Sequence, residues 1–202
     1  ATSGQSILTL HHPDGVAGVQ WNRSKHRIFT WNHTKIYSWN DVDGSLLESV
    51  SIGQDVEEAS WSNSGNYVLF WNGSKAAIWE SSSLGLSLAL SNTENISGTL
   101  WNKDDSQVVT WGDKDIRLWD TTTGEALLSL TADEPINQIQ WAIEAHRIIG
   151  WSDREAMAWD TITGKLLASL TYDNRIIDLQ PTRNADRILI RGQDKVSIWD
   201  LS

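Results

Sequence analysis

Tryptophan recurs along this chain at a fixed interval of 40 residues. All 13 tryptophans fall into three series, and no series contains an insertion or a deletion. An internal period of this length is typical of repeat proteins, in which each repeat forms one small supersecondary unit. The 202 residues therefore hold five repeats, and we expect every tryptophan to have a structural packing role: Trp21, Trp61, Trp101 and Trp141; Trp31, Trp71, Trp111 and Trp151; Trp39, Trp79, Trp119, Trp159 and Trp199.

Each repeat has the pattern of four short strands. In the fourth repeat, polar clusters of turn-forming residues separate four apolar runs, which cover 126–130, 136–141, 147–151 and 156–159. Several runs are apolar on both faces, which favours sheets packed against other sheets. No segment has the sustained periodicity of a helix. A four-stranded unit that recurs every 40 residues is typical of a β-propeller blade.

The end of the third strand of each repeat carries a likeness to a known family. A Trp-Asp dipeptide closes three repeats and is replaced by Trp-Asn or Trp-Glu in the other two: Trp119-Asp120, Trp159-Asp160, Trp199-Asp200, Trp39-Asn40 and Trp79-Glu80. With the 40-residue period, the chain resembles the WD-repeat β-propeller family over nearly its whole length. The resemblance implies a ring of four-stranded antiparallel blades and a role in recognising other proteins.

The chain departs from that family at the residues of a hydrogen-bonded network. The family's Gly-His pair before the innermost strand is missing, and only Asp113 and Asp153 stand where the family has a turn aspartate. We therefore expect the His–Asp–Ser–Trp network of the family to be absent and packed tryptophans to replace it. The fifth repeat also departs, because Pro181 and Arg191 replace its first two tryptophans.

The phase of the repeats predicts how the chain closes. It opens with a strand at 6–10 that matches the outermost strand of a blade, and it ends before such a strand would begin. We expect a single all-β domain over 1–202, a five-bladed β-propeller of four-stranded antiparallel blades, closed where 6–10 pairs with the blade formed by 176–199. A monomer is expected; the alternatives are a half-ring that assembles with a second chain and a fragment of a longer array. The missing initiator methionine suggests a trimmed or excised chain.

Composition excludes several other classes. Sixteen basic and 26 acidic residues give a formal charge of −10, which argues against nucleic-acid binding and mildly favours a basic partner. Cysteine is absent, so disulfides and thiolate metal sites are excluded. No apolar run reaches the ~18 residues of a membrane-spanning helix, and the first residues lack the pattern of a signal peptide. We expect a cytoplasmic location without a membrane partner.

No arrangement of residues points to catalysis. The chain lacks a nucleophile elbow, a phosphate-binding glycine loop and a paired-carboxylate motif, so we expect no enzyme activity and no cofactor. His11 and His12 share a loop with Asp14, but no other repeat supplies histidine there. Exposed loop residues are therefore favoured over a metal site.

Two charged columns mark a candidate partner face. An acidic residue follows the outer strand of every repeat: Asp14, Asp55, Glu94, Glu134 and Asp173. A basic residue recurs in the next hairpin: Lys35, Lys75, Lys114, Arg154 and Lys195. We expect both columns around one mouth of the central channel, where they form either a docking surface for a basic peptide or ion pairs between blades.

Polar residues alternate with the first tryptophan series on the innermost strand. These residues would line a hydrated channel: Gln20, Glu58, Gln138, Gln140, Asp178 and Gln180. Water is the expected occupant.

The whole pattern indicates a non-enzymatic protein–protein interaction scaffold, or a sensor or recruitment module, either excised from a larger protein or engineered. The alternative from another class is a multivalent, lectin-like carbohydrate-binding propeller, because exposed tryptophan stacks on sugar rings. The tryptophans stand at strand ends within the packing pattern, which favours a core role over sugar contact.

Overall fold

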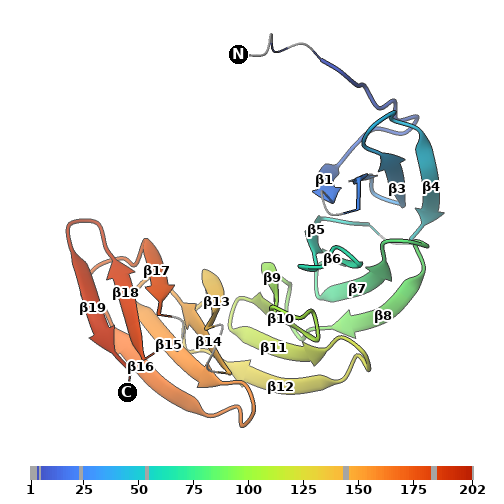
Figure 1. Ribbon diagram of the computed structural model, residues 1–202. Coiled ribbons are helices and arrows are strands. Elements are labelled where there is room, and N and C mark those ends of the chain that lie inside the picture. Colours follow the sequence, from blue (N-terminus) through green and yellow to red (C-terminus); the bar gives the residue numbers. More distant parts are fainter. Residues whose placement is uncertain are drawn as a thin grey trace. The chain divides into compact units, whose positions relative to one another are not determined.

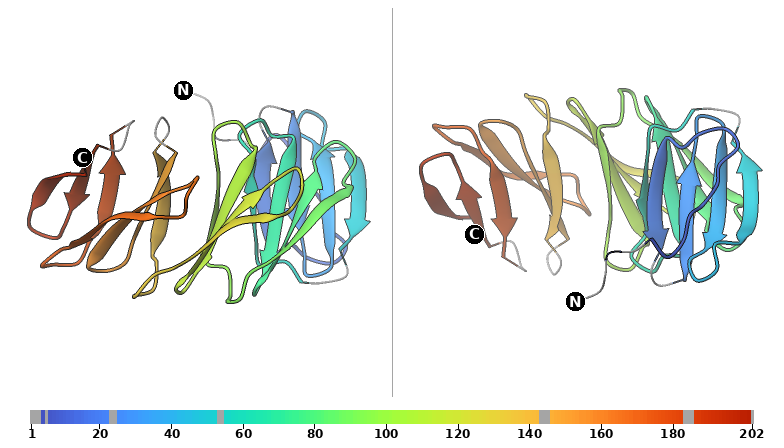
Figure 2. Two further views of the ribbon diagram at one scale, coloured as in Figure 1. Left: turned by 90° about the horizontal axis from the view of Figure 1, so that it is seen from below. Right: turned by 90° about the horizontal axis from the view of Figure 1, so that it is seen from above.

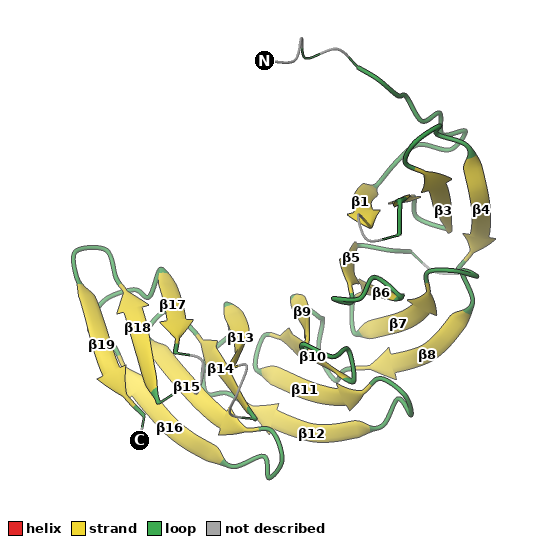
Figure 3. Ribbon diagram, viewed as in Figure 1, coloured by secondary structure: helices red, strands yellow, loops and turns green. Residues whose placement is uncertain are grey.

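The chain folds into β-sheets alone over the residues that the structure, a computed structural model, describes: 4, 6–22, 25–52, 55–142, 146–182 and 186–201. Nineteen strands form five antiparallel sheets within these ranges (Figures 1 and 3). Over the same residues there is no helix long and apolar enough to cross a membrane. The prediction of an all-β chain of repeated four-stranded antiparallel sheets is confirmed for four of the five sheets.

The chain divides into two compact units, an N-terminal unit, Ala1–Leu90, and a C-terminal unit, Ser91–Ser202. The N-terminal unit contains two sheets with their strands in chain order. The first sheet consists of β1 (Gly18–Asn22), β2 (Arg27–Trp31), β3 (Lys35–Asn40) and β4 (Leu46–Ser51). The second sheet consists of β5 (Glu58–Trp61), β6 (Tyr67–Asn72), β7 (Lys75–Glu80) and β8 (Leu86–Ser91).

The C-terminal unit contains the other three sheets. The third sheet consists of β9 (Gly98–Trp101), β10 (Gln107–Gly112), β11 (Asp115–Asp120) and β12 (Ala126–Thr131). The fourth sheet consists of β13 (Gln138–Ala142), β14 (Arg147–Trp151), β15 (Glu155–Asp160) and β16 (Leu166–Thr171). The fifth sheet has three strands, β17 (Asp178–Pro181), β18 (Arg187–Arg191) and β19 (Val196–Asp200).

Burial differs between the strands of a sheet and follows their sequences. The middle strands of the first four sheets are buried on both faces; β6, for example, buries the consecutive residues Val68, Leu69 and Phe70. The fourth strands β4, β12 and β16 instead share a pattern in which exposed and partly buried residues alternate. A strand buried on both faces lies between two packed layers, whereas alternation is typical of a strand with one solvated face.

Neighbouring sheets of the same unit pack through large side chains. In the N-terminal unit, Trp61 on β5 lies edge-on to Phe29 on β2 with ring centroids 4.7 Å apart, and Trp31 contacts Phe70 at 5.8 Å. In the C-terminal unit, apolar clusters join the third sheet to the fourth and the fourth to the fifth. Figure 2 shows that the connecting loops of each sheet lie at the two ends of its strands.

The aspartate of the Trp-Asp dipeptide fixes the turn into the outer strand. Oδ1 of Asp120 accepts hydrogen bonds from the backbone N–H groups of Thr122 and Thr123, both at 2.8 Å. Asp160 caps the equivalent turn of the fourth sheet. The turn after Asp120 ends at Gly124 with φ 76°, which glycine adopts without a steric cost.

The predicted closing strand is not paired in the structure. Ser6–Leu10 lies outside the β-strands, and the fifth sheet has no fourth strand within the described ranges. The segment belongs to the N-terminal unit, where the Leu8 side chain lies against Gly44. The pairing of 6–10 with 176–199, and the single closed ring over 1–202, stay predictions.

Candidate functional site

The two charged columns lie in the loop before each sheet and in the hairpin between its second and third strands. In the first sheet, Lys35 Nζ lies 3.9 Å from Asp14 Oδ2, and in the fifth, Lys195 Nζ lies 3.1 Å from Asp173 Oδ2. Each pair joins the loop before a sheet to the hairpin of the same sheet. The expectation of ion pairs between blades is therefore wrong for these two pairs, because the nearest cation belongs to the acid's own repeat.

Two of the other three acids also contact their own hairpins. Glu94 Oε2 accepts a hydrogen bond from the backbone N–H of Lys114 at 3.1 Å, and Glu134 Oε2 accepts one from Ser152 Oγ at 2.9 Å. Asp55 Oδ1 instead lies 3.9 Å from Nδ1 of His33, in the hairpin of the preceding sheet, so this pair joins the first and second sheets. The acidic column thus fastens each connecting loop to a hairpin. No ion pair with the column acids is found among the described residues for Lys75 or Arg154.

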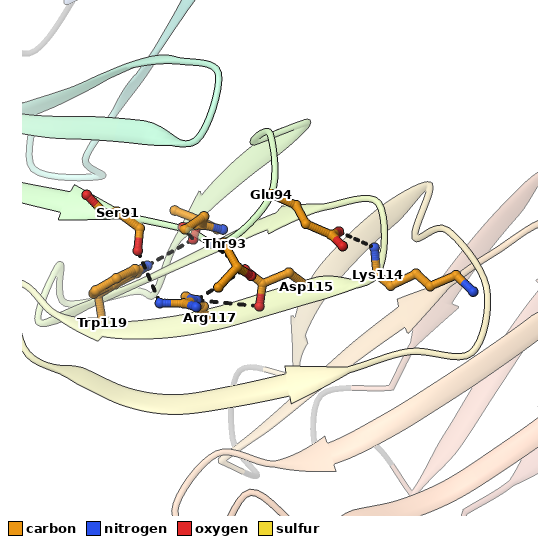
Figure 4. Close-up of polar contacts among 9 residues, drawn as sticks. Ser91, Thr93, Glu94, Lys114, Asp115, Arg117 and Trp119 are labelled. Atoms are coloured by element: carbon orange, nitrogen blue, oxygen red, sulfur yellow. Dashed lines mark hydrogen bonds and ion pairs between the residues drawn. The ribbon is translucent and has the colours of Figure 1, made fainter.

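Figure 4 shows a polar cluster of the third sheet that the sequence analysis missed. Asp115 is buried, and its Oδ2 accepts hydrogen bonds from Thr93 N at 3.1 Å, Thr93 Oγ1 at 2.7 Å and Arg117 Nε at 3.1 Å. Arg117 also donates to the backbone oxygen of Ser91 at 3.1 Å, and its guanidinium lies 5.9 Å from the Trp119 ring. A buried charge needs such partners. The available signal was an aspartate where three other repeats have lysine.

A hydrogen-bonded chain of three side chains, which the sequence analysis did not predict, is present in the first sheet. Trp39 Nε1 donates to Thr30 Oγ1 at 2.7 Å, and Thr30 Oγ1 lies 2.8 Å from His12 Nε2. An indole N–H can only donate, so the threonine oxygen accepts from Trp39, while the direction of the bond between Thr30 and His12 depends on the imidazole tautomer. Burial lowers the pKa of His12, which favours the neutral imidazole. The chain joins a tryptophan, a threonine and a histidine; the expected absence of the family's network with an aspartate stays a prediction.

The third sheet repeats this chain with asparagine in place of histidine. Trp119 Nε1 donates to Thr110 Oγ1 at 2.9 Å, and Thr110 Oγ1 donates to Asn92 Oδ1 at 2.8 Å. The second and fourth sheets have Phe70 and Gly150 at the position of the threonine. Among the first four repeats the polar chain therefore occurs in the first and the third, and the fifth repeat has Ile190 at the position of the threonine.

The predicted channel-lining residues lie on the first strands of their sheets. Gln20 Nε2 donates to the backbone oxygen of Ala59 at 2.6 Å, which links the first strands of the two sheets of the N-terminal unit. Gln180 Nε2 donates to Asp178 Oδ2 at 3.2 Å. The remaining three are exposed or partly buried: Glu58, Gln138 and Gln140.

A pocket of about 610 Å³ opens at the loop end of the fourth and fifth sheets, lined by Asn137, Gln138, Trp151, Arg175, Ile176, Ile177 and Gln193. Asn137 Nδ2 and Arg175 Nε donate to Asp153 Oδ1 at 2.9 and 3.1 Å. The hydrogen bond from Asn137, followed by the charge of Arg175, holds the pKa of Asp153 below its ordinary value. Ile177 is 47% exposed, so apolar surface stands beside a fixed cation.

Two further pockets occupy equivalent places at the opposite end of the sheets. The N-terminal unit has one of about 360 Å³, lined by Lys25, Arg27, Asn66, Tyr67, Glu80, Ser81 and Ser82. The C-terminal unit has one of about 280 Å³, lined by Asn102, Lys103, Asp104, Gln107, Trp141, Ala142, His146 and Thr161. Only the second includes a tryptophan, and that ring is partly exposed.

The remaining predicted residues have packing or loop roles. The second and third tryptophan series are buried in the first four repeats, whereas Trp21 of the first series is 56% exposed. His11 is exposed. Across the described ranges, no three metal-binding side chains of His, Cys, Asp or Glu gather in one place.

A comparison of the sequence with protein-family models gave no match, and a comparison with curated proteins gave no significant relative.

Proposed function

We propose that this chain is a non-enzymatic protein-interaction module built from WD-like repeats, cytoplasmic and without a cofactor. The observation that carries the proposal is the pocket of the fourth and fifth sheets, where the half-exposed Ile177 stands beside Arg175. Protein interfaces combine an apolar anchor with an arginine and a polar rim in this way. Arg175 lies 3.1 Å from Asp153 in an exposed ion pair, which biases the orientation of the guanidinium while leaving it accessible to a partner.

The charge of the chain favours a basic partner. A formal charge of −10 attracts a basic peptide over long range and raises its association rate at low salt. Asp173, with 88% of its side chain exposed, and the half-exposed Asp153 lie at the loop ends of the fifth and fourth sheets. A peptide with an apolar residue flanked by lysine or arginine would satisfy both features.

Affinity capture from a lysate of the source organism tests the proposal. The three baits are the wild-type chain, Ile177→Asp in the pocket, and Ile162→Asp as the matched control. Ile162 is 70% exposed on the turn before β16, away from the pocket residues. Proteins retained by the wild type and the control should be lost from Ile177→Asp. The same proteins on all three baits would refute a partner site in this pocket.

We further propose that the five sheets form one five-bladed ring closed by residues 6–10. The support is the phase of the repeats, together with a fifth sheet that has three strands where the other sheets have four. Closure would remove an open sheet edge, which soluble proteins avoid. A single species near 22.7 kDa in solution is the expected result. A species of twice that mass would favour the half-ring that assembles with a second chain.

A lectin-like function is the second candidate, and one observation favours it. The partly exposed Trp141 lines the pocket of about 280 Å³ with Asn102, Asp104 and His146. An aromatic wall with a few polar groups suits a small polyhydroxylated ligand. Binding to a glycan array that Asp104→Ala abolishes would support this candidate. If the chain binds no sugar on the array, the lectin-like function is contradicted and only the protein-interaction proposal remains.

A further inference from the structure

Ser6–His11 has the burial of an outer strand although it lies outside the β-strands. Its side chains are exposed except at Leu8 and Leu10, which are partly buried. The outer strands β4, β12 and β16 have the same order of exposed and partly buried residues at the equivalent positions. The segment therefore turns the same two side chains inward as a true outer strand does.

The contact made by Leu8 has a counterpart in the C-terminal unit. A Cβ on Gly44 would lie 2.6 Å from Leu8 Cδ1, and a Cβ on Gly164 would lie 3.0 Å from Leu128 Cδ2. Leu8 and Leu128 are three repeats apart, and so are the two glycines. Leu128 belongs to β12, the outer strand of the third sheet, while Gly164 belongs to the fourth. Ser6–His11 thus lies against the first sheet as the outer strand of a preceding sheet would.

The fifth sheet presents an edge that matches this strand. Its last strand is β19, where Val196 is 60% and Ile198 is 72% exposed. The equivalent residues Ile36 on β3 and Ile78 on β7 are fully buried, at 0% exposure. An edge strand with exposed apolar side chains is a template for one more strand.

The other sheets predict the register in which such a strand would pair. The third and fourth strands pair identically in the first, third and fourth sheets, with a register shift before the tryptophan. Moved by whole repeats, this register sets Val196 opposite Leu10 and Ile198 opposite Leu8, with the shift before Trp199. Both pairs are aliphatic, and cross-strand pairs of this kind stabilise a sheet.

We infer that the edge of β19 is a docking site for an extended strand of a partner protein with leucine-like side chains at two alternate positions. Ser6–His11 is the chain's own copy of such a ligand. The backbone of β19 supplies hydrogen bonds, and Val196 and Ile198 select the side chains. This docking site would give the proposed interaction module a defined class of partner. It rests on the proposed ring in one respect: in a closed ring, Ser6–His11 competes with the partner for the edge of β19.

Fluorescence anisotropy with a labelled peptide of the sequence 4–12 tests the inference on the full chain. The control peptide carries aspartate in place of both leucines. The chain variants are Leu8→Asp/Leu10→Asp, which frees the edge, Ile198→Asp, which blocks it, and Ile162→Asp as the control. The peptide should bind Leu8→Asp/Leu10→Asp about tenfold or more tightly than the wild type, because the chain's own strand no longer competes. Ile198→Asp should lose binding and Ile162→Asp should keep the wild-type affinity.

Each other outcome has one meaning. Equal binding of the two peptides, or full binding to Ile198→Asp, would overturn the inference; if circular dichroism shows Ile198→Asp unfolded, Val196→Lys replaces it. Equal binding to the wild type and to Leu8→Asp/Leu10→Asp would support the docking edge and contradict closure by residues 6–10. A wild-type dimer that these two substitutions abolish would assign the edge to a second copy and overturn the partner strand. Capture through Ile177 without peptide binding would leave the proposed function standing alone.

Discussion

The first and third sheets differ from the second and fourth at the position that meets the third tryptophan series. Thr30 and Thr110 each accept a hydrogen bond from an indole N–H. Thr110 also donates to Asn92, and Thr30 is also hydrogen-bonded to His12. Phe70 and Gly150 stand in their place in the other two sheets and can make no such bond. The site next to the third-series tryptophan is therefore occupied in two ways, by a hydrogen-bonded polar chain in the first and third sheets and by a residue without a polar side chain in the second and fourth.

The same pairs of sheets differ again at the start of their first strands. The first and third sheets have Gly18 and Gly98 there, whereas the second and fourth have Glu58 and Gln138. A Cβ on Gly98 would lie 2.3 Å from Trp111 Cζ2, so the tryptophan ring occupies the space that a side chain takes in the fourth sheet. Alternate sheets among the first four thus agree at both positions, whereas the fifth repeat has Asp178 and Ile190 there. The following substitutions test the difference between the third and fourth sheets and between the first and third.

Giving the third sheet the side chain of the fourth should have the largest effect. Gly98→Gln forces the ring of Trp111 out of its place, and we expect the free energy of unfolding to fall by about 3 kcal/mol. Urea unfolding followed by circular dichroism measures the change. The reverse substitution Gln138→Gly should cost less than about 1 kcal/mol. Equal costs would mean that the two kinds of sheet do not differ at this site.

Breaking the polar chain should have the next largest effect. Thr110→Val keeps the shape of the side chain but leaves the buried Trp119 N–H and Asn92 amide without this partner, at a cost of about 2 kcal/mol. Thr131→Val, at an exposed position of β12, is the control and should change stability by less than about 0.5 kcal/mol. Adding Asn92→Leu to Thr110→Val should restore part of the loss in a double-mutant cycle. Strict additivity would show that the two residues act separately.

The first sheet should respond to pH where the third does not. Burial lowers the pKa of His12 below its ordinary value of 6.5. Above that pH the imidazole is neutral in both states; as the pH falls below it, the unfolded chain takes up a proton that the folded chain resists, so stability decreases toward the folded pKa. His12→Asn, which copies the third sheet, should remove this part of the dependence. Denaturation midpoints at several pH values measure it, and parallel curves for both chains would contradict a neutral His12.

The charged columns should have the smallest effect. Asp14 and Lys35 are 3.9 Å apart with 56% and 43% of their side chains exposed. Asp14→Asn should change the free energy of unfolding by less than about 0.5 kcal/mol, and high salt should remove even that. Urea unfolding at low and high salt checks both statements. A larger loss would show that the column braces the loop more strongly than an exposed pair can.

Strand positions could be predicted from the sequence because tryptophan and turn-forming clusters bound each run. The run 147–151 coincides with β14, and 156–159 lies inside β15. The run 136–141 begins two residues before β13, since the backbone N–H of Ile136 donates to Asp113 O at 2.7 Å and not to the ladder with β14. Local pattern thus places strands well but misses where a loop contact replaces a sheet hydrogen bond.

Side-chain partners could not be predicted from one repeat taken alone. His12 and Thr30 are 18 residues apart and meet only because the loop crosses the second strand of the same sheet. A comparison between alternate repeats would have shown threonine at 30 and 110 and a polar residue at 12 and 92. The charged columns were found by their period, but their pairing depends on which loop and hairpin share one end of a sheet, which no period reports.

Because Trp21 is exposed, its fluorescence can be distinguished from that of the buried tryptophans and reports on the first sheet. Among the 13 tryptophans, all within the described ranges, this is the one whose side chain is more than half exposed. A small aqueous quencher such as acrylamide should therefore reach its emission first, while the buried indoles continue to emit at shorter wavelength. Any ligand or second copy that covers β1 would shield that one fluorophore, so the emission of Trp21 reports on what binds at the N-terminal sheet.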